Sequence, residues 1–398
     1  MSQKKILIVG AGASGLMAGI MAAREGAKVT ILEHNDKPGK KINATGNGKC
    51  NLTNLNQYEE AYRGTHPEFA RDALTAFSLS DTLNFFSSLG LYLSDRNGYV
   101  YPHSGQASSV TEVLCMEAAH LGVTIKTREH VTHVFYQDSR WKVQTESWTY
   151  EGDRVILAGG SCASSLPGAD GSNYHLAQEL GHTLIPPLPA LTALKCKGNR
   201  FSPWAGVRTE GTVTLYIDKK PVMQERGELQ LTEYGVSGIP VFQLSRYGIR
   251  ALEEGHLVTL SLDFLPEFTP EELTEFLRQR KHNCPYKKEK DLLVGLFPEK
   301  LGKVLLSKGS LEKAIKKFPL EVQGGLPFGQ AQICSGGVDT SQVHSKTMES
   351  RLHPGLYFAG ELLDIDGTCG GYNLQWAWSS GAVAGQAAAR SANRKERT

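Results

Sequence analysis

The chain lacks the features that define several large classes of protein. Its seven cysteines are widely scattered, the closest two being Cys162 and Cys196, so the spacings of a zinc site and of a redox-active cysteine pair are both absent. The formal net charge is only +2 over 398 residues, which gives no electrostatic reason to expect a nucleic-acid or membrane partner. We therefore expect reduced thiols, no metal site and a cytoplasmic location.

Long hydrophobic runs are also scarce. The uncharged stretch from Ile6 to Ala23, behind two lysines, has the length of a signal peptide or a membrane helix. Glycines and a serine interrupt it, and Arg24-Glu25-Gly26-Ala27 leads into a further strand rather than a cleavage site. We therefore expect a soluble protein without membrane association.

The sequence does contain a dinucleotide-binding fingerprint at its start. An apolar strand leads into GAGASG at 10–15, a helix-like stretch follows, and a second strand ends at Glu33. Gly10 permits the tight turn, Gly12 lets backbone N–H groups approach a pyrophosphate, and Gly15 lets the helix pack closely on the strand. The positive end of the helix then faces the phosphates, and Glu33 can accept a hydrogen bond from a ribose hydroxyl.

A second glycine-rich motif lies near the other end of the chain. A strand ending at Phe358-Ala359-Gly360-Glu361 is followed by paired glycines and a helix of small residues to about Arg390. A helix beginning near Gly371 would direct backbone N–H groups at the N1/O2 edge of a flavin, where the reduced ring accumulates negative charge. The alternative is that these glycines only permit tight helix packing. Because a nicotinamide cofactor needs no second motif, the two motifs together favour FAD.

The region between the motifs contains further local signals. The runs 131–137, 141–147 and 148–150 predict an antiparallel meander, and 154–160 predicts a buried strand that breaks into a glycine turn. A segment rich in proline, 186–189, predicts a crossover into short alternating strands of a small barrel or sandwich.

Three segments carry signals for the start or the end of a helix. Ser80 to Leu89 predicts a helix that ends at a glycine, and Ser109-x-x-Glu112 resembles a capping box for a helix ending at Gly122. Thr269-Pro270-Glu271-Glu272 places an N-cap, a first-turn proline and an N3 glutamate in order, and lysine-rich helices are expected to follow to about Lys317.

Three long stretches together carry a family resemblance: GAGASGLMAG at 10–19, PGKKINATGNGKCNLTN at 38–54, and GLYFAGELLDIDGTCGGYNLQWAWSSGAVAG at 355–385. The chain resembles a bacterial family of FAD-dependent oxidoreductases that includes aminoacetone oxidase-like and bile-acid enone reductase-like proteins. The resemblance implies an α/β fold, namely a two-part FAD-binding Rossmann-like domain of the glutathione-reductase type with an inserted β-barrel domain and a helical subdomain. The expected boundaries are 1–190 and 326–398 for the FAD domain, 191–267 for the barrel and 268–325 for the helices.

The fingerprints and the resemblance together predict the cofactor site. The resemblance implies that the 39–51 loop runs along the flavin and that Val131 meets the adenine through its backbone. The residues expected to bind FAD are Gly10, Gly12, Ala13, Ser14, Gly15, Glu33, Lys41, Gly48, Cys50, Asn51, Val131, Ala158, Gly159, Gly360, Glu361, Asp364, Gly371, Tyr372, Asn373, Leu374 and Gln375.

Several of these side chains have two interpretations. Lys41 either neutralises cofactor charge or is an ordinary loop lysine. Cys50 and Cys369 are interpreted as small packing residues rather than redox groups. Tyr372 is a candidate for stacking on substrate or flavin, and His103 a candidate for lining the substrate pocket. The residues that carry catalysis are left unassigned.

Three functions follow from these observations. The first is hydride transfer from NAD(P)H through flavin to a small organic acceptor, for which the resemblance suggests an activated C=C bond such as a steroid or bile-acid enone. The second is an amine oxidase that passes electrons to oxygen. The third is a flavoprotein that binds RNA through the barrel, against which the near-neutral charge counts.

The sequence predicts no second Rossmann domain that would bind NAD(P)H. Gly324 to Gly329 has neither a strand leading in nor a helix leading out, so we interpret it as a loop. NAD(P)H should then use the same flavin face as the acceptor, with ping-pong kinetics.

Overall fold

The computed structural model describes residues 3–166, 169–198 and 201–390, and the chain divides into two compact units. One unit is formed by residues 1–187 together with 333–398, and the other by residues 188–332. The two ends of the chain therefore build one unit, and the middle builds another.

The first unit holds both fingerprints. Its helices are α1 (Ala13–Arg24), α2 (Lys40–Ala44), α3 (Phe69–Ala76), α4 (Leu79–Ser88), α5 (Ala107–His120), α6 (Ser172–Glu179) and α11 (Tyr372–Arg390). Its strands are β1 (Lys5–Val9), β2 (Lys28–Glu33), β3 (Thr53–Asn54), β4 (Tyr62–Arg63), β5 (Leu93–Arg96), β6 (Tyr99–Pro102), β7 (Thr124–Thr127), β8 (Val131–Gln137), β9 (Arg140–Thr145), β10 (Thr149–Gly152), β11 (Arg154–Leu157), β19 (Ile333–Val338), β20 (Leu356–Phe358) and β21 (Asp366–Gly367).

A parallel sheet of order β20-β11-β1-β2-β7 organises this unit. After their first residues, Lys5 and Arg154, β1 and β11 are apolar and buried, as expected for parallel strands covered on both faces. β1 pairs with β2 on one side and with β11 on the other, so the chain order reverses beside it. The crevice at the carboxyl end of β1 is therefore the topological switch point where such sheets bind dinucleotides, and the predicted α/β Rossmann-type fold is confirmed.

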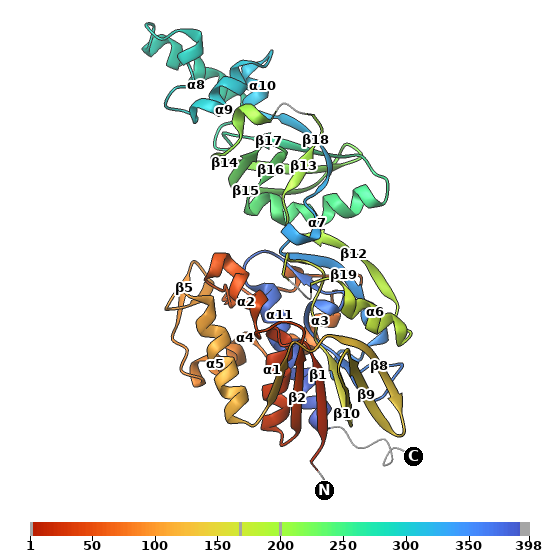
Figure 1. The fold of residues 1–398 in the computed structure, drawn as a ribbon. Coiled ribbons are helices and arrows are strands. Elements are labelled where there is room, and N and C mark those ends of the chain that lie inside the picture. The colour runs from red at the N-terminus through yellow and green to blue at the C-terminus, as the bar shows by residue number, and fades with distance from the viewer. Residues whose placement is uncertain (1–2, 167–168, 199–200, 391–398) are drawn as a thin grey trace. The chain divides into compact units, whose positions relative to one another are not determined.

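Helices α1 and α11 come from opposite ends of the sequence and lie side by side (Figure 1). Gly381 and Gly385 are one turn apart on α11. An added Cβ would lie 2.4 Å from the Ser14 carbonyl oxygen at the first and 2.2 Å from the Ala18 carbonyl oxygen at the second. These glycines allow the two helix backbones to approach each other directly.

Most local predictions for the first unit are confirmed, and one is wrong. The meander is present as β8, β9 and β10. The capping box at Ser109 is wrong, because α5 begins at Ala107 and Ser109 lies inside it. Ala107 is buried in the core, which draws the start of the helix to an earlier residue than the polar pattern indicated. The crossover predicted at 186–189 is confirmed, because the first unit ends at Pro187 and the second begins at Leu188. The same segment also forms part of strand β12 (Leu184–Ala190), which pairs with β19 in a two-stranded sheet whose edges tolerate proline.

The second unit contains a closed barrel of order β13-β16-β15-β14-β17-β18. Its elements are β13 (Leu194–Cys196), β14 (Val207–Ile217), β15 (Lys220–Thr232), β16 (Gly235–Ser237), α7 (Ile239–Glu253), β17 (Val258–Asp263), α8 (Pro270–Asn283), α9 (Glu299–Leu306), α10 (Leu311–Lys316) and β18 (Phe318–Gly325). The cap of α8 is as predicted, since the Thr269 hydroxyl accepts from the Glu272 N–H and the Glu272 carboxylate accepts from the Thr269 N–H.

One strand of this barrel overturns two expectations. β18 lies in the segment 268–325 that was expected to be helical, and it closes the barrel against β13 and β17. Gly324 and Gly325 are the last two residues of β18, so the Gly324–Gly329 segment does have a strand leading into it. The strand is antiparallel, and only a short 3₁₀ turn (Phe328–Gln330) follows, so the segment differs from a Rossmann turn.

None of the helices in the described parts of the chain combines the length and apolar character that a bilayer crossing requires.

The buried His182 predicts an acid-sensitive fold. The residue is 3% exposed, its ring packs against Phe358, and its Nε2 lies 3.0 Å from the Ser350 hydroxyl oxygen. Burial, followed by the charge of His353, lowers the pKa of His182 from 6.5 to about 4. Between these two values the unfolded chain binds a proton that the folded chain does not, so the free energy of unfolding falls as the pH is lowered through this window. His182→Gln should flatten that dependence in urea titrations of the free energy of unfolding between pH 7 and 4, with the parent chain measured beside it as the reference.

Candidate functional site

The turn after β1 forms a cradle at the switch point. Gly10 has a φ of +98°, and a Cβ there would lie 2.7 Å from the Ala158 carbonyl oxygen. A Cβ at Gly15 would lie 1.9 Å from the Gly10 carbonyl oxygen. At Gly12, by contrast, no heavy atom lies within 4 Å of an added Cβ. Packing therefore requires two of the glycines, and the third leaves open the space that a pyrophosphate needs at the start of α1.

Glu33 is fixed at the end of β2 beside this cradle. The residue is 7% exposed, and its carboxylate Oε2 accepts a 2.7 Å hydrogen bond from the Ala11 N–H. Oε1 accepts from the backbone N–H and the side-chain amide of Asn35, at 2.8 and 2.7 Å. A carboxylate has about four acceptor positions, so these bonds orient the group and leave room for one ribose hydroxyl.

Lys41 reaches the C-terminal motif. Its Nζ lies 2.5 Å from Glu361 Oε2, and the Ser161 hydroxyl donates to the same oxygen at 2.9 Å. The ammonium also donates to the Ser161 hydroxyl at 3.5 Å. These three side chains, which we call the Lys41–Ser161–Glu361 cluster, come from α2, the loop after β11 and the segment after β20. Ser161 was not among the predicted residues, and only its position after Gly159-Gly160 could have indicated it.

The two fingerprints meet in the first unit. A Cβ at Gly360 would lie 2.5 Å from the Ser14 hydroxyl, and one at Gly371 would lie 2.6 Å from the Thr53 carbonyl oxygen. Asn54 Nδ2 also donates to the Gly370 carbonyl at 2.9 Å. The segment 360–371 thus contacts both Ser14 of the first fingerprint and Thr53–Asn54, and α11 begins directly after it.

Some predicted side chains are engaged within the protein. The Tyr372 hydroxyl donates to the Asn56 carbonyl at 2.6 Å, and its ring packs edge-on against Tyr58. Asn373 bonds the backbone of Gly367, and the buried Gln375 bonds Thr53, Thr82 and Ser379. The polar atoms of these three side chains are therefore held by partners within the protein, and Leu374 lies between Asn373 and Gln375 on the first turn of α11.

The remaining predicted residues lie at the ends of strands or in loops of the first unit. Ala158 N–H donates to the Val9 carbonyl, Gly159 approaches Asn173, and Asp364 Oδ2 accepts from the Thr65 N–H at 2.8 Å. Val131 is buried at the start of β8. Gly48 and Cys50 have φ values of +80° and +55° in the loop that contains Asn51.

Two cysteines in these motifs are poorly suited to redox chemistry. Burial raises the pKa of Cys50 to about 12 and that of Cys369 to about 11. Both remain protonated at neutral pH, and a thiol is a weak nucleophile. This supports their interpretation as packing residues.

Two tyrosines of β6, Tyr99 and Tyr101, lie next to the loops that contain Gly370 and Gly46. A Cβ at Gly370 would lie 2.7 Å from Tyr99 Cε1, and one at Gly46 would lie 3.9 Å from Tyr101 Cε1. Residues two apart on a strand share one face, so both rings project from the same side of β6. Burial raises the pKa of each hydroxyl, which keeps both as hydrogen-bond donors. The sequence did not indicate either tyrosine, because nothing in its local pattern places β6 against these loops.

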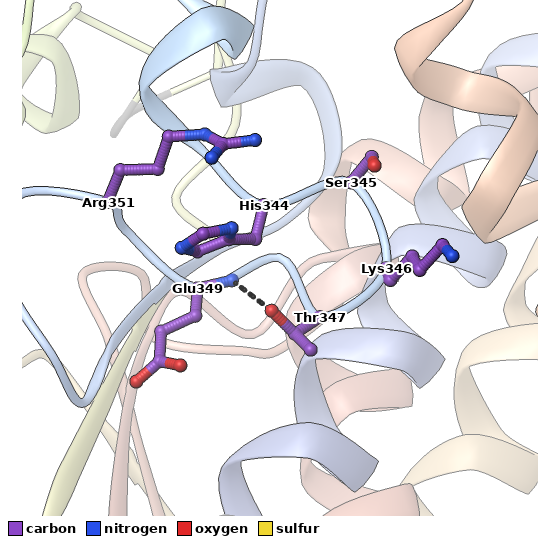
Figure 2. Close-up of a pocket in the computed structure, with 6 residues that line it drawn as sticks. All are labelled: His344, Ser345, Lys346, Thr347, Glu349 and Arg351. Carbon is purple, nitrogen blue, oxygen red and sulfur yellow. Dashed lines mark hydrogen bonds between the residues drawn. The ribbon is translucent and has the colours of Figure 1, made fainter.

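A separate hollow of about 410 Å³ lies in the loop before β20 (Figure 2). His344, Lys346 and Arg351 are among its lining residues, and the Glu349 N–H donates to the Thr347 hydroxyl at 3.3 Å. No lining residue belongs to the two fingerprints, so this hollow is distinct from the dinucleotide cradle.

The cradle, the fixed acid and the second glycine motif on one parallel sheet define a flavin-dependent oxidoreductase with a two-part Rossmann domain, and FAD is its cofactor. The chain belongs to the family described as HI0933-like protein Rossmann domain, which matches residues 4–387.

Individual proteins are similar over nearly the whole chain. This chain is 43% identical to the 3-dehydro-bile acid delta(4,6)-reductase of Clostridium scindens, over 97% of this chain and 99% of that protein. It is 31% identical to the ribosomal RNA dihydrouridine synthase of Haemophilus influenzae, over 94% of this chain and 96% of that protein. Among solved structures, the 3-ketosteroid-delta4-(5alpha)-dehydrogenase of Rhodococcus jostii shares the fold, with a TM-score of 0.50 at 15% identity, over 98% of this chain and 97% of that one.

Proposed function

We propose that this chain is an FAD-dependent reductase of C=C bonds conjugated to a carbonyl, with a steroid-like or bile-acid-like enone as acceptor and NAD(P)H as donor. The observation that carries the proposal is the full-length similarity to a bile-acid delta(4,6)-reductase, joined to a site in which both FAD fingerprints meet. Bound FAD would supply the hydride. The residues that would hold it are the Gly10–Gly15 turn, Glu33, the Lys41–Ser161–Glu361 cluster and the backbone at the start of α11.

The side chains of the protein must then stabilise the negative charge that develops on the substrate and deliver a proton to the substrate. When hydride adds to the far carbon of an enone, negative charge develops on the carbonyl oxygen, and a fixed donor close to that oxygen lowers the barrier. The Tyr99 and Tyr101 hydroxyls are donors beside the loops that would flank the flavin. We assign Tyr101 to the carbonyl oxygen, because the 39–51 loop beside it is the one expected along the ring.

Tyr101→Phe is expected to lower kcat for enone reduction about tenfold or more, because the hydroxyl acts on charge that develops only in the transition state. Anaerobic reduction of the flavin by NADH should keep its rate, since that half-reaction does not use the enone. Stopped-flow measurement of the two half-reactions separates these effects. Tyr136→Phe, on the exposed side of β8, is the matched control. An equal slowing of both half-reactions would contradict the assignment.

Steady-state kinetics test the donor and the acceptor together. The second unit contributes a barrel rather than a second Rossmann sheet, which supports one shared flavin face and therefore parallel lines in double-reciprocal plots. Flavin bleaching by NADH, followed by reoxidation with a 3-oxo-4-ene bile acid, would support the reductase. Bleaching by aminoacetone with peroxide formed in air would favour the amine oxidase instead.

A ribosomal RNA substrate is the second candidate function, favoured by a specific surface. Tyr286 is 78% exposed, and Lys281, Lys288 and Lys290 are exposed around it in sequence, which is a combination typical of RNA contacts. The C5=C6 bond of uracil is conjugated to a carbonyl, so reduction to dihydrouridine needs the same hydride chemistry as an enone. The similarity to ribosomal RNA dihydrouridine synthases agrees with it.

The RNA candidate is tested by reacting the enzyme with ribosomal RNA and NADH and measuring dihydrouridine by mass spectrometry. Salt-sensitive RNA retention that is weakened by Lys288→Glu with Lys290→Glu, but not by Lys219→Glu with Lys220→Glu on the barrel hairpin, would support it. Turnover of bile-acid enone without dihydrouridine formation would reject it.

A further inference from the structure

We propose that Cys162 and Cys334 form a peroxide-sensitive dithiol site, in which Cys162 is oxidised first, Cys334 closes a disulfide with it, and the disulfide weakens the binding of FAD. The two residues are 172 positions apart in sequence, yet their sulfur atoms lie 3.5 Å apart. Cys162 lies in the loop after β11 and Cys334 on β19, both within the first unit.

The two thiols differ in exposure and in pKa, as stepwise oxidation to a disulfide requires. Cys162 is partly exposed, whereas Cys334 is buried, so an oxidant reaches Cys162 first. The hydrogen bond from the Cys334 thiol, aided by the charge of Lys41, lowers the pKa of Cys162, while the same contact and burial raise the pKa of Cys334. A partly exposed cysteine with thiolate character beside a second thiol is the arrangement that gives reversible oxidation.

The chemistry balances with hydrogen peroxide as the oxidant. The Cys162 thiolate attacks one peroxide oxygen, the O–O bond breaks, and hydroxide leaves, which gives a sulfenic acid. The Cys334 sulfur then attacks the Cys162 sulfur, the S–O bond breaks, and water leaves with the Cys334 proton. Two thiols are thereby oxidised to one disulfide, and a dithiol reductant restores them.

The disulfide would act on the cofactor site through neighbouring residues. A disulfide bond of about 2 Å is much shorter than the present sulfur separation of 3.5 Å, so both cysteine side chains must change their orientation, in the loop after β11 and on β19. Ser161 is adjacent to Cys162 and donates to Glu361. β19, which carries Cys334, packs on the segment that contains Glu361. A Cβ at Gly337 of β19 would lie 2.6 Å from the carbonyl oxygen of Leu362, the residue after Glu361. Closure of the disulfide therefore disturbs the Lys41–Ser161–Glu361 cluster from two directions.

The first experiment counts thiols on the wild-type holoenzyme. Graded peroxide should lower the count from the seven cysteines of the sequence to five, and dithiothreitol should restore it. Peptide mass spectrometry without reduction should find Cys162 joined to Cys334. A different cysteine pair, or loss of thiols that dithiothreitol does not reverse, would overturn the proposal.

Variants and a binding measurement test the remaining steps. Cys334→Ser should leave Cys162 to oxidise beyond the sulfenic acid without forming a disulfide, whereas Cys115→Ser, at a partly exposed cysteine on α5, should still form it. The dissociation constant of FAD should rise about fivefold or more in the oxidised protein, and it should return to its original value when the disulfide is reduced. An unchanged FAD affinity in fully oxidised protein would reject the proposed effect on the cofactor. None of these readouts depends on the substrate of the enzyme.

Discussion

Gly12→Val is expected to abolish tight FAD binding and to leave the fold of the FAD-free chain intact. The backbone at Gly12 is extended, with φ −81° and ψ −165°, which valine adopts readily. No heavy atom within 4 Å opposes an added Cβ. The branched side chain would instead occupy the space that a pyrophosphate needs at the start of α1. FAD affinity should fall about 100-fold or more, which corresponds to ~2.7 kcal/mol.

Titration of the FAD-free protein with FAD, followed by flavin fluorescence, measures this effect, and urea unfolding of the same preparation measures stability. The matched control is Gly309→Val in the second unit, where an added Cβ also meets no heavy atom within 4 Å. It should bind FAD normally. Tight FAD binding by Gly12→Val would show that the pyrophosphate does not approach this turn.

The parts of the fold that could be predicted are those determined by residues close together in sequence. The strand, turn, helix and second strand from Lys5 to Glu33 form one contiguous unit, and the role of each glycine follows from local backbone geometry. The cap at Thr269 is equally local, because its partner Glu272 lies one turn away. Such features need no knowledge of the tertiary structure.

The contacts that assemble the site could not be predicted in the same way. Lys41 and Glu361, or Cys162 and Cys334, are brought together by strands β11, β19 and β20, and no spacing in the sequence encodes their distance. The lack of closely spaced cysteines correctly described the sequence, but it did not exclude a cysteine pair in space. Tyr99 and Tyr101 were missed for a related reason, since β6 faces glycine loops that come from other parts of the chain.

The errors in the local predictions have a common cause as well. At Ser109 the polar spacing of a capping box was present, but burial of Ala107 in the core decided where α5 begins. In the segment 268–325, the lysine-rich helices concealed β18, whose Phe318, Leu320 and Val322 alternate into the barrel core. In both places tertiary burial outweighed a local signal.

Gly385→Ala is expected to destabilise the protein by about 3 kcal/mol, although alanine is the better helix former. The added methyl group would lie 2.2 Å from the Ala18 carbonyl oxygen on α1, and a backbone atom cannot rotate away as a side chain can. The two helices must therefore separate, which also loosens the contact between the N-terminal and C-terminal fingerprints. Gly248→Ala on α7 makes the same change inside a helix, but there the nearest atoms are side-chain carbons of Leu215 and Val258 at 3.5 Å, an ordinary contact distance. That variant should instead be stabilised by up to about 1 kcal/mol. Urea unfolding of the two variants beside the parent chain measures both effects, and a neutral or stabilised Gly385→Ala protein would show that α1 and α11 do not pack as closely as the structure places them.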